Sequence, residues 1–421
     1  MSKKKKILVL SDHPLSPSGV GTQTKYFIEA MLKTGKYKFI CFGGAIKHVN
    51  YDPIQVEGYG EDWVIIPIDG YGNPDMIRSV LRTEKPDILW IMTDPRFWGW
   101  LWAMEDEIRP LVPIVYYHVW DNYPYPVYNK PWYDSCDCIA AISKVTADIV
   151  KTVSPDVESH YLPHSVDTDI FQKFSDPEIK RLRSIHFPDA SNPDKMVVFW
   201  NNRNARRKQS GTLIYWFKEF LDKVGHENAC LLMHTDIKDP HGQNLEEIVR
   251  LLGLNNGQVL FSKEKISPEA MAGLYNMADC TVNIADAEGF GLATFESLAC
   301  ETPIIVTMTG GLQEQVTNGK EWFGFGLEPA SKAVIGSQDI PYIYEDRVSK
   351  EDFLKAMVEM CEMHHEKRKE MGAKGRQHVM ENYNFDNFAK SWEEIMDGVV
   401  ERCGSWETRK NYCSWTFKEV A

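Results

Sequence analysis

Short apolar runs alternate with helix-like stretches along most of this chain, and this alternation limits the folds open to it. The first run, Lys6–Asp12, reads KILVLSD and leads through a turn with Pro and Gly into an amphipathic stretch. The same order recurs with the runs YKFICFGG, DWVIIPI, PDILWIM, PIVYYHV and CIAAIS. Apolar runs of this length are typical of parallel strands that helices cover on both faces. The first half therefore predicts a doubly wound α/β domain.

The pattern starts again after the polar stretch His186–Lys195, which reads HFPDASNPDK. The apolar runs that follow it are MVVFWNN, ACLLMHT, QVLFS and CTVNIA. The chain has 421 residues, too many for one core of ~100–200 residues. We therefore predict a second doubly wound domain, with boundaries at 1–193 for the first domain, 194–385 for the second and 386–421 for a helical tail.

Two glutamates flank a glycine turn in the second half, where the chain reads DAEGFGLATFESLAC. The turn EGFG follows a predicted strand, so we expect a helix to begin near Leu292. Glu288 then lies in the loop, and Glu296 lies about one turn inside the helix. The unpaired N–H groups of the first helical turn point between the two carboxylates and favour an anion, typically a phosphate.

A nucleotide sugar matches this order of carboxylate, N–H groups and carboxylate. It has a hydroxyl-rich ring at one end, phosphates in the middle and a ribose at the other end, and carboxylates accept two hydrogen bonds from vicinal hydroxyls. Taken singly, Glu296 is explained by the helix dipole and Glu288 as a solvated loop residue. The pair together with its glycines favours a ligand site.

The motif resembles that of the retaining glycosyltransferases of family 4, which have the GT-B fold. The match consists of two glutamates separated by seven residues, the strand TPIIVT after them, and Gly310–Gly311. The resemblance implies two Rossmann-like doubly wound domains that face each other across a cleft, with a C-terminal helix that crosses back to the first domain. It also implies that Glu288 contacts the transferred sugar and Glu296 the ribose.

The resemblance extends to the residues around the turn and to the loop after the first strand of the second domain. That loop reads NNRNARRKQSG, and the family pattern assigns the donor diphosphate to Arg203 and Lys208, with Arg206 or Arg207 as the alternative to these cations. Two cations there would stabilise a departing diphosphate without a metal ion. The turn residues that the resemblance assigns to donor binding are Gly289, Phe290, Gly291 and Leu292.

Two further parts of the first domain match the family in outline. The loop SPSGVGTQTKYF follows the first strand, so Gly19 and Gly21 would let the backbone approach the donor phosphate or the acceptor. The strand IVYYHVW ends with His118, at the place where the family often has a functional histidine near the donor sugar. A histidine at a strand end is otherwise explained as structural.

The expected function is transfer of a hexose, with retention, from a nucleoside diphosphate sugar of the GDP-mannose or UDP-glucose type to a hydroxyl of a glycan or lipid acceptor. We expect neither a cofactor nor a metal ion. The alternatives are a sugar-nucleotide epimerase of the same fold and a non-catalytic nucleotide-sugar binding protein. The base, the sugar, the acceptor and the oligomeric state stay open at this point.

Charge and composition limit the kinds of binding partner and the cell compartment that we expect. The formal net charge of -13 argues against a nucleic-acid binder, which would have a clustered basic surface. The 9 cysteines favour reduced thiols and a cytoplasmic protein without a secretory leader. Because no apolar run approaches the ~20 residues of a membrane span, we expect a protein that is not integral to a membrane, although Lys3–Lys6 would allow peripheral contact with anionic lipid.

Overall fold

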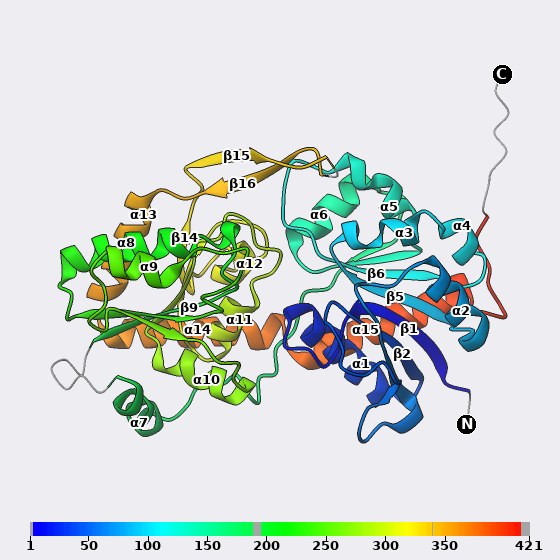
Figure 1. Cartoon of the computed structure of the whole chain (residues 1–421), viewed down its shortest axis with the longest axis horizontal. Coiled ribbons are helices and arrows are strands. Elements are labelled where there is room, and N and C mark those ends of the chain that lie inside the picture. Colours follow the sequence, from blue (N-terminus) through cyan, green and yellow to red (C-terminus); the bar gives the residue numbers. More distant parts are fainter. Residues whose placement is uncertain (1–2, 188–194, 339, 414–421) are drawn as a thin grey trace. The chain divides into compact units, whose positions relative to one another are not determined.

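The computed structural model describes residues 3–187, 195–338 and 340–413, and the contacts divide the chain into two compact units. The first unit contains residues 1–165 and 386–421, and the second contains residues 166–385. Both are α/β units built on a mainly parallel sheet, which confirms the predicted fold class of two doubly wound domains (Figure 1). The cleft between the domains stays a prediction.

The first unit has an eight-stranded sheet in the order β3-β4-β2-β1-β5-β6-β7-β8. All its neighbouring strands are parallel except β3, which runs antiparallel to β4 at one edge. The strands are β1 (Lys5–Asp12), β2 (Tyr37–Gly44), β3 (Ile54–Gln55), β4 (Trp63–Pro67), β5 (Ile88–Thr93), β6 (Ile114–His118), β7 (Cys138–Ala141) and β8 (Ser159–Tyr161).

Helices cover both faces of this sheet, with α1 and α15 together on one of them (Figure 1). The other face carries α3, α5 and α6, which follow strands β5, β6 and β7. The helices of the unit are α1 (Gly19–Lys33), α2 (Pro74–Glu84), α3 (Gly99–Trp102), α4 (Glu105–Ile108), α5 (Lys130–Asp134), α6 (Lys144–Val153) and α15 (Phe385–Cys403).

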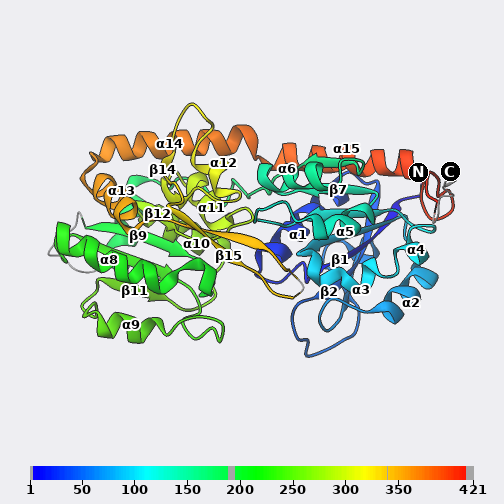
Figure 2. The same cartoon turned by 90° about the horizontal axis from the view of Figure 1, so that it is seen from above.

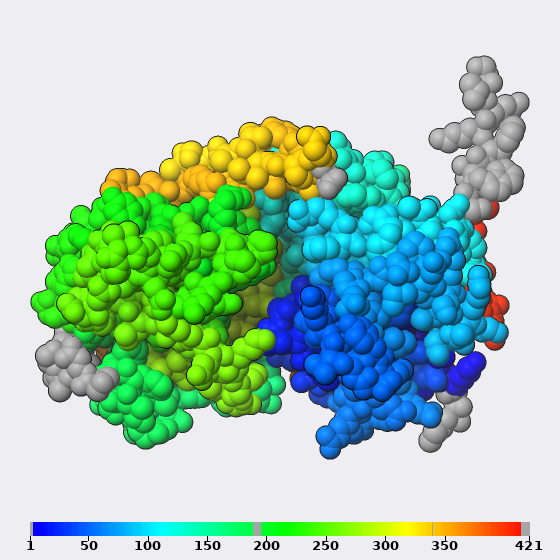
Figure 3. All heavy atoms as spheres, in the orientation of Figure 1, coloured from blue at the N-terminus to red at the C-terminus, as the bar shows by residue number. Residues whose placement is uncertain are grey.

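The second unit has a six-stranded parallel sheet in the order β11-β10-β9-β12-β13-β14. Its strands are β9 (Met196–Asn201), β10 (Ala229–His234), β11 (Val259–Ser262), β12 (Cys280–Asn283), β13 (Ile304–Thr307) and β14 (Gly324–Leu327). A separate antiparallel ribbon of β15 (Ser331–Ile335) and β16 (Ile343–Arg347) lies at the surface of the unit (Figure 3). No apolar run in the sequence predicts this ribbon.

The helices of the second unit also form two layers. In the view of Figure 1, α8, α9 and α13 lie above the sheet, and α10 and α14 lie below it. The helices are α7 (Asp176–His186), α8 (Ser210–Val224), α9 (Leu245–Leu251), α10 (Pro268–Met277), α11 (Leu292–Ala299), α12 (Leu312–Val316), α13 (Lys350–Glu362) and α14 (His365–Asn382). Among the described helices, none is long and apolar enough to cross a membrane.

Local sequence signals explain where several helices begin. The side chains of Asn73, Ser267 and Ser349 accept hydrogen bonds from backbone N–H groups in the first turns of α2, α10 and α13. These bonds satisfy donors that have no partner within the helix. Proline occupies the start of α2 and α10, where its missing N–H costs nothing.

The observed division of the chain differs from the predicted boundaries in one segment. The boundary predicted between residues 193 and 194 lies outside the described residues. The described part of the segment just before it, including α7, belongs to the second unit because α7 packs against α10. The amphipathic stretch Asp176–His186 lacks an apolar run of its own, so the sequence offered no signal for assigning it to either domain.

Helix α15 is part of the first unit because it packs against one face of that unit's sheet. Its Trp392 is fully buried. The Trp392 ring lies 4.7 Å from the ring of Phe27 in α1 and 5.0 Å from the ring of Tyr117 in β6. It also lies edge-on to Trp90 of β5, at 5.8 Å. A buried aromatic cluster of this kind stabilises the folded unit, both through the apolar area that it buries and through the favourable geometry of its ring contacts.

We expect Trp392→Ala to lower the free energy of unfolding of the first unit by about 3–5 kcal/mol, because it leaves a cavity among three aromatic rings. Urea denaturation followed by fluorescence measures the effect. Lys390→Ala, on the same helix with a side chain 76% exposed, is the matched control and should change stability by less than about 0.5 kcal/mol. Equal stability of the two variants would show that α15 does not brace the unit.

Candidate functional site

The candidate site is formed by two loops that follow neighbouring strands in the middle of the second unit's sheet. Strand β9 pairs with β12, and the chain order reverses there, since β10 and β11 extend to one side and β13 and β14 to the other. The loops after β9 and β12 therefore leave the same edge of the sheet at a topological switch point. Ligands of doubly wound sheets bind at such points.

Lys208 and Glu288, 80 positions apart in the sequence, contact each other across these two loops. Lys208 ends the short 3-10 turn Arg206–Lys208, and its Nζ donates to the carboxylate of Glu288. Asn283, the last residue of β12, donates from Nδ2 to the same carboxylate at 3.3 Å. The side chains of Lys208 and Glu288 are only 9% and 12% exposed, so the pair is largely shielded from water.

The surroundings of Glu288 keep its carboxylate ionised. Burial acts to raise its pKa, but the charges of Lys208 and Arg207 and the hydrogen bonds from Lys208 and Asn283 outweigh burial. The net result is a pKa below the ordinary value for glutamate. A negative hydrogen-bond acceptor and a positive donor therefore coexist at the switch point.

Helix α11 begins at Leu292, where the sequence analysis predicted its start. The first of its amides to donate within the helix is that of Phe295, which bonds to the carbonyl of Gly291 at 3.1 Å. The amides of Leu292 and the two residues after it belong to the open end of the helix. Gly291 adopts a φ of 94°, a left-handed conformation that suits glycine at this turn.

The glycine turn is held against the next loop by close backbone contacts. A Cβ atom on Gly311 would lie 2.6 Å from the Cα of Phe290 and 2.8 Å from the oxygen of Gly289. The amide of Gly311 donates to the carbonyl of Glu288 at 3.1 Å. The side chain of Phe290 is buried, with its ring 5.1 Å from the ring of Phe295. Phe290 therefore belongs to the core, and only its backbone forms the turn.

Glu296 lies one turn inside α11 and takes part in a partly buried hydrogen-bond chain. Its Oε2 accepts from the hydroxyl of Tyr275 at 2.8 Å, and that hydroxyl accepts from Asn201 Nδ2 at 2.9 Å. Burial raises the pKa of Glu296 to about 7, and the hydrogen bond from Tyr275 only partly opposes this effect. The two glutamates of the motif thus have opposite pKa shifts.

The arginines of the loop after β9 have different partners. Arg203 is 62% exposed and pairs with Asp239, with Nη2 at 3.2 Å from Oδ1. Arg207 donates to the carbonyl of Ala287 at 2.5 Å, and its charge helps to lower the pKa of Glu288. Of these two arginines, Arg207 is the one whose contacts join it to the glutamate loop. The phosphate contact predicted for Arg203 stays a prediction.

The ribbon of β15 and β16 is tied to both loops by charged contacts. Glu345 accepts two hydrogen bonds from Arg206, at 2.9 and 2.6 Å. Arg347 pairs with Asp286, and the backbone amide of Asp346 donates to the carbonyl of Asp286 at 2.8 Å. The ribbon therefore helps to fix the two loops that carry Lys208 and Glu288.

In the first unit, Gly19 and Gly21 form the start of α1, after the loop that follows β1. The N-cap residue Ser18 accepts a hydrogen bond from the amide of Gly21 at 2.9 Å and donates to Asp12 at 2.6 Å. A Cβ atom on Gly21 would lie 2.7 Å from the carbonyl oxygen of His13, whereas Gly19 is exposed. The close packing explains the glycine at position 21; the ligand contact predicted for both glycines stays a prediction.

His118 is fully buried at the carboxyl end of β6. Its Nε2 lies 2.8 Å from the hydroxyl of Tyr133, and burial lowers the pKa of His118 to about 3. The imidazole is therefore neutral at physiological pH and has no exposed surface in this structure. Its predicted contact with the donor sugar stays a prediction.

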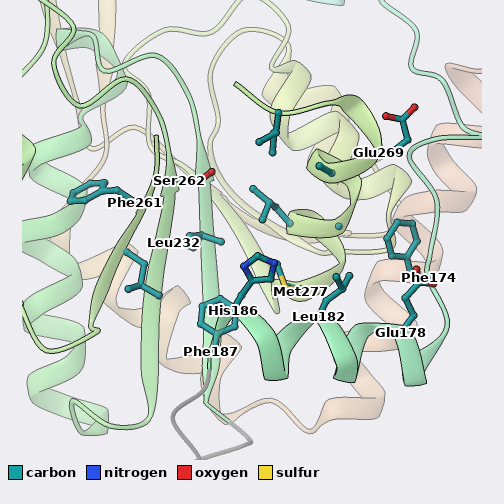
Figure 4. A pocket seen from close by; sticks show the side chains of 15 residues that line it. Phe174, Glu178, Leu182, His186, Phe187, Leu232, Phe261, Ser262, Glu269 and Met277 are labelled. Carbon is teal, nitrogen blue, oxygen red and sulfur yellow. The ribbon is translucent and has the colours of Figure 1, made fainter. Parts of the chain in front are cut away.

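A separate apolar cavity of about 710 Å³ lies in the second unit between α7, α10 and the strands β10 and β11 (Figure 4). Its described lining includes Leu182, Leu232 and Met277, together with the polar side chains of His186 and Glu269. The described lining does not include the predicted donor residues. The cavity and the Lys208–Glu288 pair are thus different features of the unit.

Three residues that position the site were not predicted from the sequence: Asn201, Tyr275 and Asn283. Asn201 and Asn283 end apolar strands, and a polar residue at the carboxyl end of a buried strand is a usable signal. Tyr275 lies within an ordinary helical pattern, LYNMA. Its role depends on the contact between α10 and α11, which the sequence pattern does not indicate.

The raised pKa of Glu296 predicts a pH-dependent stability. Because the folded state binds the Glu296 proton more tightly than the unfolded state, with its ordinary pKa near 4.5, stability falls as pH rises from there to about 7. Glu296→Gln keeps an acceptor for Tyr275 but has no proton to lose. We expect its unfolding free energy, relative to the unaltered chain, to increase by up to about 3 kcal/mol across this range.

Urea denaturation of both chains at about pH 5 and pH 7.5 checks this expectation. Glu288 does not interfere, because its lowered pKa affects stability only at more acidic pH. A stability difference that is the same at both pH values would contradict the raised pKa of Glu296.

Comparison with known proteins shows which family the second unit resembles. Residues 183–378 match the family model described as glycosyl transferases group 1. A curated relative, the D-inositol 3-phosphate glycosyltransferase of Corynebacterium jeikeium, is 28% identical over 163 residues, which is 38% of this chain and 38% of the relative. The matched segment thus spans well under two thirds of that protein's length.

Solved structures extend the likeness to nearly the whole chain, at low sequence identity. The sucrose-phosphate synthase of Thermosynechococcus elongatus superposes with a TM-score of 0.73 at 16% identity, over 94% of this chain and 100% of that chain. Anabaena HepE in complex with UDP and glucose has a TM-score of 0.68 at 14% identity, over 94% of this chain and 100% of that chain. The chain therefore has the GT-B fold, and its residues 183–378 are similar to the group 1 glycosyltransferases.

Proposed function

We propose that this chain is a retaining, metal-independent glycosyltransferase that moves a hexose from a nucleoside diphosphate sugar to a hydroxyl acceptor. The donor is of the GDP-mannose or UDP-glucose type, and the acceptor is a glycan or lipid. The observation that carries the proposal is the contact between Lys208 and Glu288 beside the open end of α11. The match of residues 183–378 to the group 1 glycosyltransferases supports it.

The donor would bind with each part against a complementary group. The diphosphate would lie against Lys208 and the first amides of α11, where the positive charge and the helix dipole favour an anion. Glu288, ionised and largely shielded from water, would accept hydrogen bonds from the sugar hydroxyls. Glu296 would accept from the ribose hydroxyls one helical turn away.

The second cation of the diphosphate site is either Arg203 or Arg207. Arg203 is the residue expected from the family pattern. Its guanidinium, which pairs with Asp239, would have to bind Asp239 and the phosphate at the same time. Arg207 is favoured by its position, since its contact with Ala287 brings it to the loop of Glu288. Either guanidinium would stabilise the negative charge that grows on the leaving diphosphate.

The chemistry proposed is substitution on one face of the sugar. The bond between the anomeric carbon and the phosphate oxygen breaks, the acceptor oxygen bonds to the same face, and the leaving phosphate takes the acceptor proton. Glu288 is occupied by Lys208 and by the sugar hydroxyls, so it is poorly placed to act as a nucleophile for a double displacement. In this scheme the protein contributes orientation and charge rather than a base.

Glu288→Gln should reduce transfer at least about 100-fold, because a neutral amide cannot match a carboxylate as acceptor for the sugar hydroxyls. The fold should survive, since the amide oxygen can still accept from Lys208. Nuclear magnetic resonance measures the conversion of a donor that is incubated with the unaltered chain or with the variant, in the presence and in the absence of acceptor sugars. Epimerised donor without acceptor would instead indicate an isomerase, and binding without transfer or hydrolysis would indicate a binding protein.

Lys208→Ala should weaken binding of a nucleoside diphosphate about 10- to 100-fold while changing the affinity for the corresponding nucleoside much less, because only the former carries phosphates. Isothermal titration calorimetry with UDP and uridine, and with GDP and guanosine, measures both affinities. Lys218→Ala, which removes a lysine paired with Asp222 on α8, is the control and should leave them unchanged. Equal losses for nucleoside and diphosphate would remove Lys208 from the phosphate site.

A further inference from the structure

Three side chains of three chemical types meet at one edge of the first unit's sheet. Cys138 begins β7, Glu158 directly precedes β8, and His160 lies in β8. The sulfur of Cys138, a carboxylate oxygen of Glu158 and a ring nitrogen of His160 all lie within 4.8 Å of one another. Thiolate, carboxylate and imidazole are the three side-chain ligands that zinc sites in proteins combine.

The strand register explains why these side chains converge. Strands β7 and β8 are parallel, with Ile139 opposite Ser159 and Ala140 opposite His160. Because side chains alternate along a strand, Cys138 shares one face of the sheet with Glu158 and His160. The backbone therefore places all three side chains on the same face of the sheet.

The cluster combines a buried ligand with accessible ones. Cys138 is fully buried, whereas β8 is the edge strand and leaves the side chains of Glu158 and His160 29% and 41% exposed. An ion could therefore enter from the side of the edge strand. Once bound, it would contact a sulfur shielded from solvent, and shielding of this kind protects a metal–thiolate bond from competing water.

Helix α15 reaches the same cluster from the tail of the chain. Glu158 Oε1 accepts a hydrogen bond from His160 Nε2 at 2.7 Å, and Arg402 near the end of α15 contacts the same oxygen. Figure 2 shows the end of α15 on the side of the unit that carries β7. A metal ion held by the cluster would therefore stabilise the place where the tail helix meets the sheet edge.

Burial raises the pKa of Cys138, and the nearby charge of Glu158 acts in the same direction. The ion-free thiol is thus protonated at neutral pH. A divalent cation reverses this preference, because its charge stabilises the thiolate.

We propose that Cys138, Glu158 and His160 bind a zinc ion, with a fourth coordination position for water. On binding, the S–H bond of Cys138 breaks, a sulfur–zinc bond forms and the proton leaves to solvent. Neutral His160 donates a ring-nitrogen lone pair, and Glu158 supplies one oxygen while its second oxygen can accept from Arg402. The proposed zinc ligands are separate from Lys208, Glu288 and Glu296 of the proposed transfer reaction, which belong to the second unit.

The test measures metal binding by the full-length chain, in a background where the exposed Cys413 is replaced by serine. The protein is stripped with a chelator, incubated with zinc, freed of unbound metal by gel filtration and assayed for zinc by mass spectrometry. We expect one zinc ion per chain and a higher melting temperature than in the stripped protein. With Co2+ as the probe, we expect a thiolate-to-cobalt charge-transfer band and an affinity that increases with pH.

Cys138→Ala and His160→Ala should each lose the bound zinc and the increase in melting temperature. His160 is the safer variant, since its side chain is partly exposed, and circular dichroism verifies that the variant folds. Cys230→Ala, which removes a buried thiol of the second unit, is the control and should retain one zinc ion. Absence of zinc from the unaltered chain, or equal zinc in the unaltered chain and in His160→Ala, would overturn the proposal.

Discussion

The ion pair between Lys208 and Glu288 is the interaction on which the arrangement of the second unit's loops depends. Two opposite charges so poorly exposed to water are costly to bury, and removing either partner would leave the other uncompensated. The pair therefore keeps the loop after β9 and the loop after β12 in contact. Because β9 and β12 are neighbours at the switch point, this contact positions both loops at that edge of the sheet.

The surrounding contacts reinforce the same arrangement from several directions. Asn283 donates to Glu288, the backbone of Glu288 accepts from Gly311, and Arg207 bonds to the carbonyl of Ala287. Each of these groups comes from the carboxyl end of a strand or from the loop that follows it. The site is thus a product of strand order.

The opposite pKa shifts of the two glutamates show how one motif creates two environments. Glu288 lies among cations, and its carboxylate stays charged; Glu296 lies against a tyrosine hydroxyl, where burial dominates. Spacing alone does not distinguish these cases, since both are glutamates beside a glycine turn. The difference arises because the charges of Lys208 and Arg207 outweigh the effect of burial on the pKa of Glu288, whereas at Glu296 burial is opposed only by the hydrogen bond from Tyr275.

The sequence was informative where the signal is local and periodic. The apolar runs predicted both sheets, and the turn EGFG predicted the start of α11 at Leu292. It was uninformative where partners come from other elements: Tyr275 beside Glu296, Asp239 beside Arg203, and the burial of His118 against Tyr133. The ribbon of β15 and β16 was missed because its strands are short and half-exposed, so they lack the apolar run that marks a buried strand.

The ribbon of β15 and β16 couples the positions of the two loops that it contacts. It is joined to the loop after β9 through Glu345 and Arg206, and to the loop after β12 through Arg347 and Asp286. Its outer part carries exposed apolar side chains, including Val334 at 64% and Tyr342 at 43%. A molecule that binds this outer part would therefore displace both loops together, and with them the residues at the switch point.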